Sequence, residues 1–391
     1  MSSQEKEKHS GESTAPEISG RESKLSDERH HHGASSATGT TTTDADTYTG
    51  RTAQFTSPAS FPLKPGQFLH DVRDRERSLV SFANNLRAMS VFDVFFDYTR
   101  VISQDAKQSA YEFSRAENDA VNRYRDIRCV DATRVNVPGA DGKNYIHANY
   151  VDGFREVHKF ILTQAPLSTS VQRFWDMIWQ EKSTLIISLT VLDGERTALY
   201  IPTKSGESIA FGEIKIVNMG TRHIRDSYDA TVLMVAKGDS QARKLLHIAF
   251  YAWPDKGTPT RPTEVLYMLD DANHNRKLLV DEAVKKGWLP AGQVSPIVVH
   301  CLAGVGRSGA LAALDICIAK LDHTHGRDNG PCLDVRDTVL RIRTQREMAV
   351  QKPEQYLFLH LATLEYAIRR RYFDSIDCVD LSKFMLKKED K

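Results

Sequence analysis

A cysteine and an arginine stand six positions apart in the stretch "VVHCLAGVGRSGALAALD", residues 298–315. Cys301 follows a short apolar run, a glycine-rich turn separates it from Arg307, and an Ala/Leu-rich segment comes next. We expect backbone N–H groups to converge at such a turn, where the dipole of a following helix favours negative charge. The pattern therefore predicts an anion site that holds a thiol and a guanidinium.

These two side chains suit attack on a bound phosphate ester. A helix N-terminus and a guanidinium lower the pKa of a cysteine, so Cys301 can attack phosphorus as a thiolate near neutral pH. Arg307 adds a bidentate fork to a cage of N–H groups from the loop residues Leu302, Ala303, Gly304, Val305 and Gly306. A lone cysteine at a strand end is ordinarily a small buried hydrophobe. The Cys-x5-Arg spacing with its glycines argues against that interpretation here.

The same loop also satisfies the dinucleotide-binding pattern G-x-G-x-x-G at residues 304–309. That fold needs an acidic residue about 20 positions further on, and Asp322 lies near that distance. The dinucleotide hypothesis gives no role to Cys301 or Arg307, and no alternating strand–helix series follows Asp322. We therefore prefer the phosphate-ester hypothesis.

Composition narrows the class of protein. The 391 residues carry 52 Lys and Arg against 51 Asp and Glu, so net charge predicts no nucleic-acid or membrane-surface partner. The sequence has no run long enough for a membrane span and no apolar core of a signal peptide near its start, which predicts a cytoplasmic protein. Five scattered cysteines predict reduced thiols, with no metal site and no disulfide framework.

Three regions follow from the pattern along the chain. Residues 1–75 are rich in Ser, Thr, Gly, Glu and Lys, so we predict that they form a disordered tail. Whether this tail binds a partner stays open. The triplet at residues 30–32 is three histidines, for which a solvated polar run is favoured over a metal site. Residues 76–373 predict one folded domain, and residues 374–391 a polar C-terminal tail.

The folded region alternates between helical and strand patterns. Apolar spacing predicts helices within 79–101 and 168–182, strands between 184 and 253, and a strand at 295–300 that leads into the loop. Further helices are expected at 309–322, at 334–347 and from Pro353 to about 373. These elements predict an α/β or α+β domain in which helices flank a central, twisted, mixed sheet, with the phosphate loop between a strand and a helix.

The segment "HCLAGVGRSG" resembles the His-Cys-x5-Arg-Ser signature of the protein tyrosine phosphatases. Tyrosine-specific and dual-specificity members share it, so other segments must decide. Resemblances follow in the family's order over residues 80–373: "NRYRDIRCVDATRV", "NYIHANYVDGF", "FILTQAPLSTSVQRFWDMIW", "WPDKGTP" and "VQKPEQY". We identify the chain as a member of the tyrosine-specific, non-receptor type. The resemblance implies phosphotyrosine-containing proteins as partners and no cofactor.

The resemblance implies a role for several side chains. Asp255 of "WPD" is similar to the general acid that protonates the leaving tyrosyl oxygen, on a loop that closes over substrate. Gln351 is similar to the glutamine that positions the attacking water, and Gln355 to its helper. Ser308 is similar to the hydroxyl that donates to the departing thiolate, and His300 is expected to help keep the cysteine ionised.

Tyr124 and Asp126 bear on the substrate. The matching family tyrosine stacks on the phosphotyrosine ring and deepens the pocket, and the matching aspartate holds the peptide backbone. Tyr124 alone would indicate a half-buried packing residue, but the surrounding "NRYRDI" favours the functional interpretation. Met348 stands where some members have a small residue, which argues against strong preference for doubly phosphorylated peptides.

The match is poorest at the loop "TVLDGERTALYIP". The family has a glutamate there that pairs with the signature arginine, usually beside a lysine. Asp193 and Glu195 are the acids in this loop, and we favour Glu195 as the partner of Arg307 because it has the longer reach and precedes Arg196. The alternative, that both acids only solvate a turn at Asp193-Gly194, stays open.

Three functions are compatible with these residues. We favour an active phosphotyrosine phosphatase that works through a covalent phosphocysteine. A phosphotyrosine-binding pseudophosphatase is the alternative from another class, but such proteins usually lose the cysteine, the arginine or the acid, and Cys301, Arg307 and Asp255 are all present. A dual-specificity phosphatase is the third.

Overall fold

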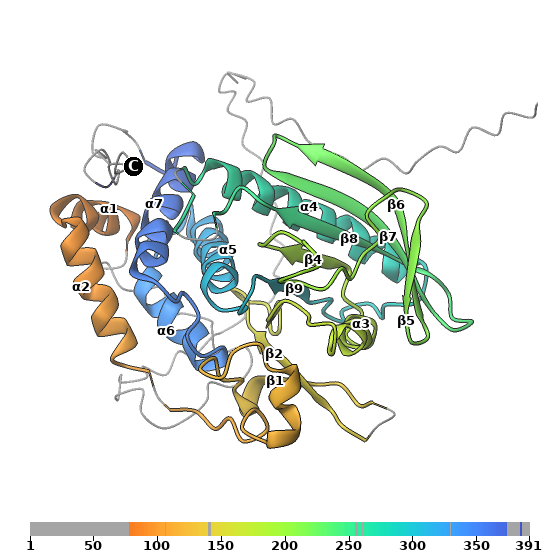
Figure 1. Ribbon diagram of the computed structural model, residues 1–391. Coiled ribbons are helices and arrows are strands. Elements are labelled where there is room, and N and C mark those ends of the chain that lie inside the picture. Colours follow the sequence, from red (N-terminus) through yellow and green to blue (C-terminus); the bar gives the residue numbers. More distant parts are fainter. Residues whose placement is uncertain are drawn as a thin grey trace, which may run out of the picture.

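A nine-stranded mixed sheet forms the centre of the structure, a computed structural model (Figure 1). The structure describes residues 78–105, 107–139, 142–254, 257–259, 261–328, 330–373 and 384. The four central strands are parallel neighbours: β3 (Phe160–Thr163), β9 (Ile297–His300), β4 (Leu185–Ser188) and β8 (Arg243–Phe250). The predicted mixed sheet flanked by helices is confirmed.

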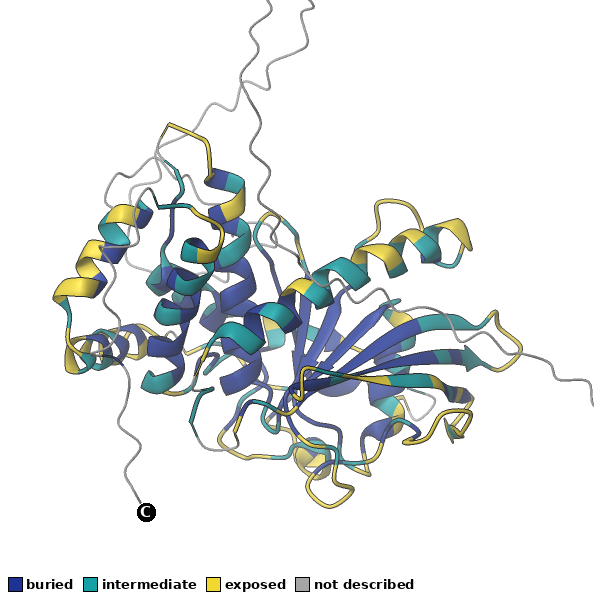
Figure 2. Ribbon diagram, turned by 90° about the horizontal axis from the view of Figure 1, so that it is seen from above, coloured by how far each residue is buried: buried dark blue, intermediate teal, exposed yellow. Residues whose placement is uncertain are grey.

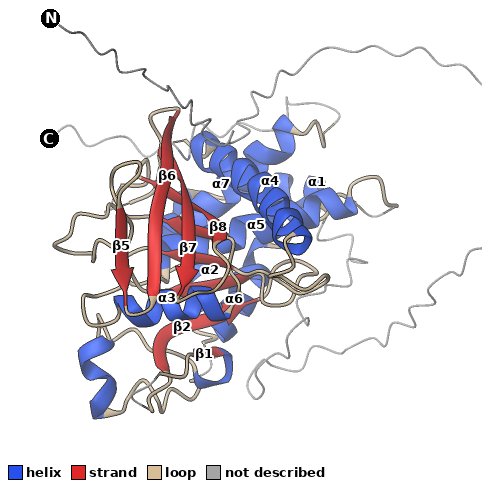
Figure 3. Ribbon diagram, turned by 90° about the vertical axis from the view of Figure 1, so that its right-hand side faces the viewer, coloured by secondary structure: helices blue, strands red, loops and turns tan. Residues whose placement is uncertain are grey.

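Antiparallel strands extend the sheet on both sides of this parallel centre. On one side lie β2 (Tyr145–Val151) and β1 (Arg134–Asn136). On the other side a meander of β7 (Tyr228–Lys237), β6 (Ile214–Ile224) and β5 (Ser208–Phe211) follows β8. Figure 3 shows these long outer strands beside the helices. The strands expected between residues 184 and 253 are therefore present.

Alternate residues of the central strands face opposite layers, as the two-residue period of a strand requires. In β9, Ile297 and Val299 pack in the large core beneath the C-terminal helices, whereas Val298 packs in the second core. The second core also holds Phe174 and Trp175 of α3 (Val171–Gln180), the helix predicted within 168–182. Burial on both faces explains why this strand is a continuous apolar run in the sequence.

Most helices lie on the face of the sheet opposite α3. They are α1 (Leu79–Ala88), α2 (Val91–Ile102), α4 (Thr263–Lys285), α5 (Gly306–Thr324), α6 (Val335–Gln345) and α7 (Pro353–Arg369), with short 3-10 turns η2 (Ala116–Val121) and η3 (Asp131–Thr133) elsewhere. Figure 2 shows α5 and the central strands as the most buried part. The helix α4 was not among the elements expected from the sequence. No helix in the described segments is both long enough and apolar enough to cross a bilayer.

The helical pattern predicted over residues 79–101 is interrupted in the structure. The first helix ends at Ala88, with Met89 as its C-cap. Ser90 begins the second helix through a capping box, in which its hydroxyl accepts from the Asp93 N–H and its own N–H donates to the Asp93 carboxylate. Residues 1–77 lie outside the described segments. Residues 374–391 do too, except Phe384, which is buried in the large core.

A buried ion pair fixes α5, the helix that follows the phosphate loop, against its neighbours. Lys159 Nζ lies 2.6 Å from Asp315 Oδ2, and both side chains are largely buried. Asn273 of α4 donates to the other carboxylate oxygen at 2.8 Å. One carboxylate therefore joins α5 to α4 and to the residue that precedes β3.

Loss of one partner should be costly because the other charge would stay buried. We expect Asp315→Ala to lower the free energy of unfolding by about 3–5 kcal/mol, measured by urea denaturation. The double variant Lys159→Met with Asp315→Leu removes both charges and should recover most of the loss. Equal loss in the single and double variants would show that shape, and not charge, sets the stability at this position.

Candidate active site

The predicted phosphate loop occupies residues 301–305, between β9 and the start of α5. The Leu302 carbonyl accepts from the Ala165 N–H at 3.0 Å. Gly304 has φ +69°, and a Cβ there would lie 2.0 Å from the Thr163 carbonyl oxygen. Glycine is therefore required at this position both for its conformation and for the close approach of the 163–165 backbone.

The Cys301 thiol is buried at the floor of this loop. Burial alone would raise its pKa, but the charge of Arg307, the hydroxyl and N–H of Ser308 and the N–H of Gly304 outweigh burial and lower the pKa below that of an ordinary thiol. Gly304 N–H donates to the sulfur at 3.2 Å. The Ser308 hydroxyl is buried, has no other hydrogen-bond partner among the described residues, and helps to lower the Cys301 pKa as a donor to the sulfur.

A second arginine, Arg346, holds the loop from behind and is fully buried. Its Nη2 donates to the Ala303 carbonyl at 2.9 Å and its Nε to the Gly304 carbonyl at 3.1 Å. Its remaining donors reach Asn149 Oδ1 at 2.8 Å and His147 Nδ1 at 3.1 Å. Sequence reasoning assigned no role to Arg346.

His147 can accept from Arg346 because it is neutral. Burial, and then the Arg346 charge, lower the His147 pKa to about 3. Its Nε2 lies 2.8 Å from the Ile127 carbonyl and must therefore carry the proton, which leaves Nδ1 as an acceptor. Polar His147 and Asn149 within the buried strand β2 are the sequence signal that could have exposed this network.

His300, the residue before Cys301, is also neutral. Burial is the main cause that lowers its pKa to about 4. Its Nδ1 lies 3.2 Å from the Cys301 carbonyl and its Nε2 lies 2.6 Å from Tyr200 Oη. Tyr200 Oη also lies 2.7 Å from His247 Nε2. The Cys301 carbonyl can only accept, so His300 Nδ1 donates to it, Tyr200 donates to His300, and His247 donates to Tyr200. This directed chain of hydrogen bonds holds the end of the strand beside Cys301.

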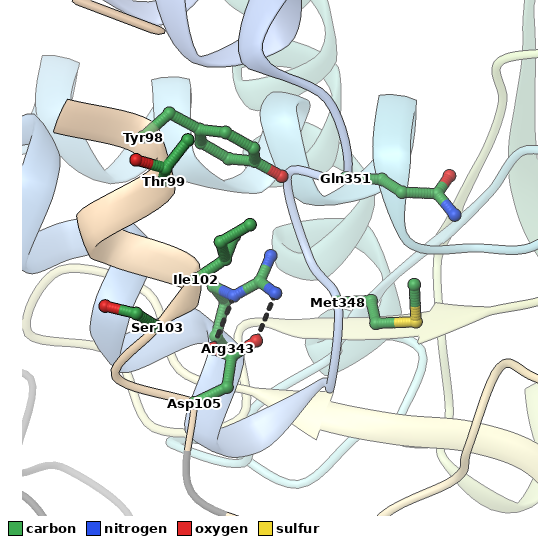
Figure 4. Close-up of a pocket in the computed structure, with 8 residues that line it drawn as sticks. All are labelled: Tyr98, Thr99, Ile102, Ser103, Asp105, Arg343, Met348 and Gln351. Carbon is green, nitrogen blue, oxygen red and sulfur yellow. Dashed lines mark hydrogen bonds and ion pairs between the residues drawn. The ribbon is translucent and has the colours of Figure 1, made fainter. Parts of the chain in front are cut away.

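The two predicted glutamines lie beside the loop. Gln355 Oε1 accepts from the N–H groups of Gln351 and Lys352 at 3.0 and 3.2 Å, which caps the first turn of α7. A Cβ on Gly306 would lie 2.8 Å from Gln355 Nε2, so the Gln355 amide touches the start of α5. Gln351 is half-buried and lines a cavity that Figure 4 shows.

The segment of Tyr124 and Asp126 is connected to the loop through Gln164. The Arg123 N–H donates to Gln164 Oε1 at 3.0 Å, and Gln164 Nε2 donates to the Val121 carbonyl at 2.8 Å. Tyr124 and Asp126 are themselves exposed, as a rim that meets a peptide requires. Their contact with substrate stays a prediction.

Asp255 lies outside the described residues, and its role as the acid stays a prediction. The flanks of its loop are described: Trp253 is buried against Phe358, with ring centroids 5.0 Å apart. Trp253 Nε1 donates to the Gly257 carbonyl at 3.3 Å. This bond joins the two ends of the segment that carries Asp255.

The two acids of the poorly matched loop differ in their surroundings. Asp193 Oδ1 accepts from the backbone N–H groups of Glu195, Arg196 and Thr197, and its pKa is lowered, first by the Arg196 side chain. Glu195 is exposed. Arg307 is buried, and its pairing with Glu195 stays a prediction.

The thiol environments predict selective alkylation. Iodoacetamide reacts with thiolates, so the labelling of Cys301 should have its inflection at a lower pH than that of an ordinary thiol. Burial raises the pKa of Cys129 to about 11 and that of Cys317 to about 12, so both should stay unmodified at neutral pH. Peptide mapping by mass spectrometry over a pH series measures this. Faster labelling of Cys129 or Cys317 than of Cys301 would contradict the assignment.

Comparison with known proteins agrees with this geometry. The family profile described as "Protein-tyrosine phosphatase" matches residues 118–365. The chain is 32% identical over 302 residues to mouse tyrosine-protein phosphatase non-receptor type 9, which covers 75% of this chain and 49% of that protein. It is 31% identical over 280 residues to tyrosine phosphatase H2 of Microplitis demolitor bracovirus (isolate Webb), which covers 71% of this chain and 82% of that protein.

A solved structure shows the same fold. The catalytic domain of human protein tyrosine phosphatase non-receptor type 18 superposes with a TM-score of 0.62 at 25% identity, over 73% of this chain and 99% of that one. The chain spans about half the length of the non-receptor type 9 relatives it matches. The matched segment contains the phosphate loop, both glutamines and Arg346. The chain therefore belongs to the protein-tyrosine phosphatase family.

Proposed function

We propose that this chain is a cytoplasmic enzyme that hydrolyses phosphotyrosine in proteins through a covalent phosphocysteine at Cys301. One observation carries the proposal: a buried thiol of lowered pKa lies under the charge of Arg307 and within donor range of the Gly304 N–H. A site built only to bind phosphate has no need of an ionised nucleophile. Thiolate chemistry also requires no metal or cofactor.

In the first step the Cys301 sulfur attacks phosphorus and the bond from phosphorus to the tyrosyl oxygen breaks. Asp255 gives its proton to that oxygen, and such general-acid help is worth about 10² to 10⁴ in rate. Arg307 and the loop N–H groups stabilise the charge that spreads over the phosphoryl oxygens. The role of Asp255 rests on its place in "WPDKGTP".

In the second step a water attacks the phosphocysteine and the sulfur–phosphorus bond breaks. The Asp255 carboxylate takes a proton from the water, while Gln351 and Gln355 hold the water in line. Ser308 donates to the departing thiolate, a role suited to a buried hydroxyl that has no other hydrogen-bond partner among the described residues. Inorganic phosphate and free thiolate result.

The loop acids have different parts in this proposal. The Asp193 carboxylate already caps its own turn through three backbone N–H groups. Exposed Glu195 is free of that capping role, which favours it as the group that orients Arg307 when substrate binds. The solvated-turn alternative for both acids stays open.

Replacing the nucleophile tests the reaction. We expect Cys301→Ser to lower hydrolysis of a phosphotyrosine peptide by at least about a thousandfold, because an alcohol at this position is not ionised and loss of a nucleophile costs at least that much. Phosphate release measures the rate, and an unchanged melting temperature shows that the fold persists. A pseudophosphatase would show no turnover even in the parent protein.

Tyr124 tests specificity. We expect the parent to cleave phosphotyrosine peptides much faster than phosphoserine peptides, and Tyr124→Ala to lower kcat/KM for phosphotyrosine by about tenfold through loss of ring stacking. Tyr111→Ala removes another exposed tyrosine and serves as the matched control. Similar parent rates on both peptides would place the protein among dual-specificity enzymes.

A further inference from the structure

Two residues just before Gln351 have an unusual backbone conformation. Met348 has φ +61° and Val350 has φ +57°, both in the left-handed region. A β-branched residue is rare there and persists only where the surroundings hold it. The backbone that presents Gln351 is therefore strained and needs external support.

Hydrogen bonds supply that support from two directions. On the side of the phosphate loop, the Val350 N–H donates to the Val305 carbonyl at 3.1 Å. On the opposite side, the Val350 carbonyl accepts from the Tyr98 hydroxyl at 2.8 Å and from Arg343 Nη1 at 3.3 Å. Arg343 Nη1 also donates to the Ala349 carbonyl at 2.8 Å. The strained backbone is thus held between the phosphate loop and α2.

Asp105 in turn holds Arg343. Arg343 Nε donates to Asp105 Oδ1 at 2.7 Å and Nη2 donates to Oδ2, a bidentate pair marked by dashed lines in Figure 4. Burial alone would lower the Arg343 pKa, but the bonds and charge of Asp105 outweigh it and raise the pKa. The guanidinium therefore stays charged and fixed in orientation.

Side-chain packing holds only part of this backbone. Ala349 and Val350 are fully buried in the large core. Met348, Gln351, Tyr98 and Arg343 line an open cavity of about 560 Å³ between α2 and the loop. Close packing therefore restrains Ala349 and Val350, whereas Met348 and Gln351 border open space. On that open side the hydrogen bonds from Tyr98 and Arg343 add to the restraint.

We propose that Tyr98 and Asp105 are positioning residues for the second step, acting through Arg343 and the Val350 carbonyl to hold Gln351 against its water. The inference rests on the proposed function and adds to it. Both residues precede the segment that matches the family profile, residues 118–365. The first step does not use Gln351, so their loss should slow breakdown of the phosphocysteine more than its formation.

The test separates the two steps. Rapid mixing with p-nitrophenyl phosphate, followed by acid quench, measures formation and decay of the phosphocysteine independently. A second measurement adds glycerol and compares transfer of phosphate to glycerol with transfer to water, which reports how firmly the site holds water. Tyr98→Phe removes one hydroxyl. Asp105→Asn weakens the bidentate pair with Arg343, and Asp105 is itself exposed, so the change leaves no buried position unfilled.

A closely matched control is available on α7. The Tyr356 hydroxyl also joins α2 to the C-terminal half, but it donates to Asp97 at 2.7 Å and not to the backbone before Gln351. The Tyr98 and Tyr356 rings lie 5.6 Å apart, so Tyr356→Phe makes the same chemical change in the same region. A general loosening of α2 would affect both variants alike.

We expect Tyr98→Phe and Asp105→Asn to slow phosphocysteine decay by about fivefold, the worth of one such hydrogen bond, to raise transfer to glycerol, and to leave formation within about twofold. Tyr356→Phe should match the parent in all three. The inference would be overturned if both variants matched the parent in phosphocysteine decay and in the transfer of phosphate to glycerol. It would also be overturned if Tyr356→Phe showed the same defects as the two variants. Absence of any phosphocysteine in the parent would instead overturn the proposed function.

Discussion

The hydrogen bonds from Arg346 to two carbonyls set the direction in which the N–H groups of the phosphate loop point. The C=O and N–H of a trans peptide unit point in opposite directions. The Ala303 carbonyl points back to Arg346, so the Gly304 N–H of the same peptide points forward, where it donates to Cys301 Sγ. The bond from Arg346 to the Gly304 carbonyl turns the next N–H forward in the same way. A cage of N–H groups therefore depends on a guanidinium behind it.

That guanidinium has an electrostatic consequence as well. Its four hydrogen bonds end on neutral acceptors, so they satisfy its donors without cancelling its charge. Burial lowers the pKa of Arg346, and the negative charge of a Cys301 thiolate is among the influences that raise it again. The attraction is mutual, so Arg346 also favours the thiolate form of Cys301, beside the larger effect of Arg307. Neutral His147 and His300 add no further charge.

Local pattern predicted the parts of the site that lie within one stretch of chain. The buried strand, the glycine turn and the following helix are adjacent in sequence, and their periodicity and turn chemistry specify them. The partner that orients the loop, Arg346, is about 40 residues away, and only the packing of α6 brings it there. Helix α4 was missed for a different reason. Its buried residues lie mainly in its first half, from Val265 to Ala272, whereas Leu278 in its second half is exposed, so the apolar pattern does not follow one face along the whole helix.

The two steps of the proposed reaction depend on different parts of the fold. Cys301 owes its lowered pKa to Arg307, Ser308 and the Gly304 N–H. The loop that carries these groups is oriented by Arg346, which β2 supports through Asn149. Gln351 owes its position to strained backbone that α2 restrains through the Tyr98 hydroxyl. Val350 joins the two systems, because its N–H binds the phosphate loop while its carbonyl binds Tyr98. A displacement of α2 therefore reaches Gln351 without passing through Cys301.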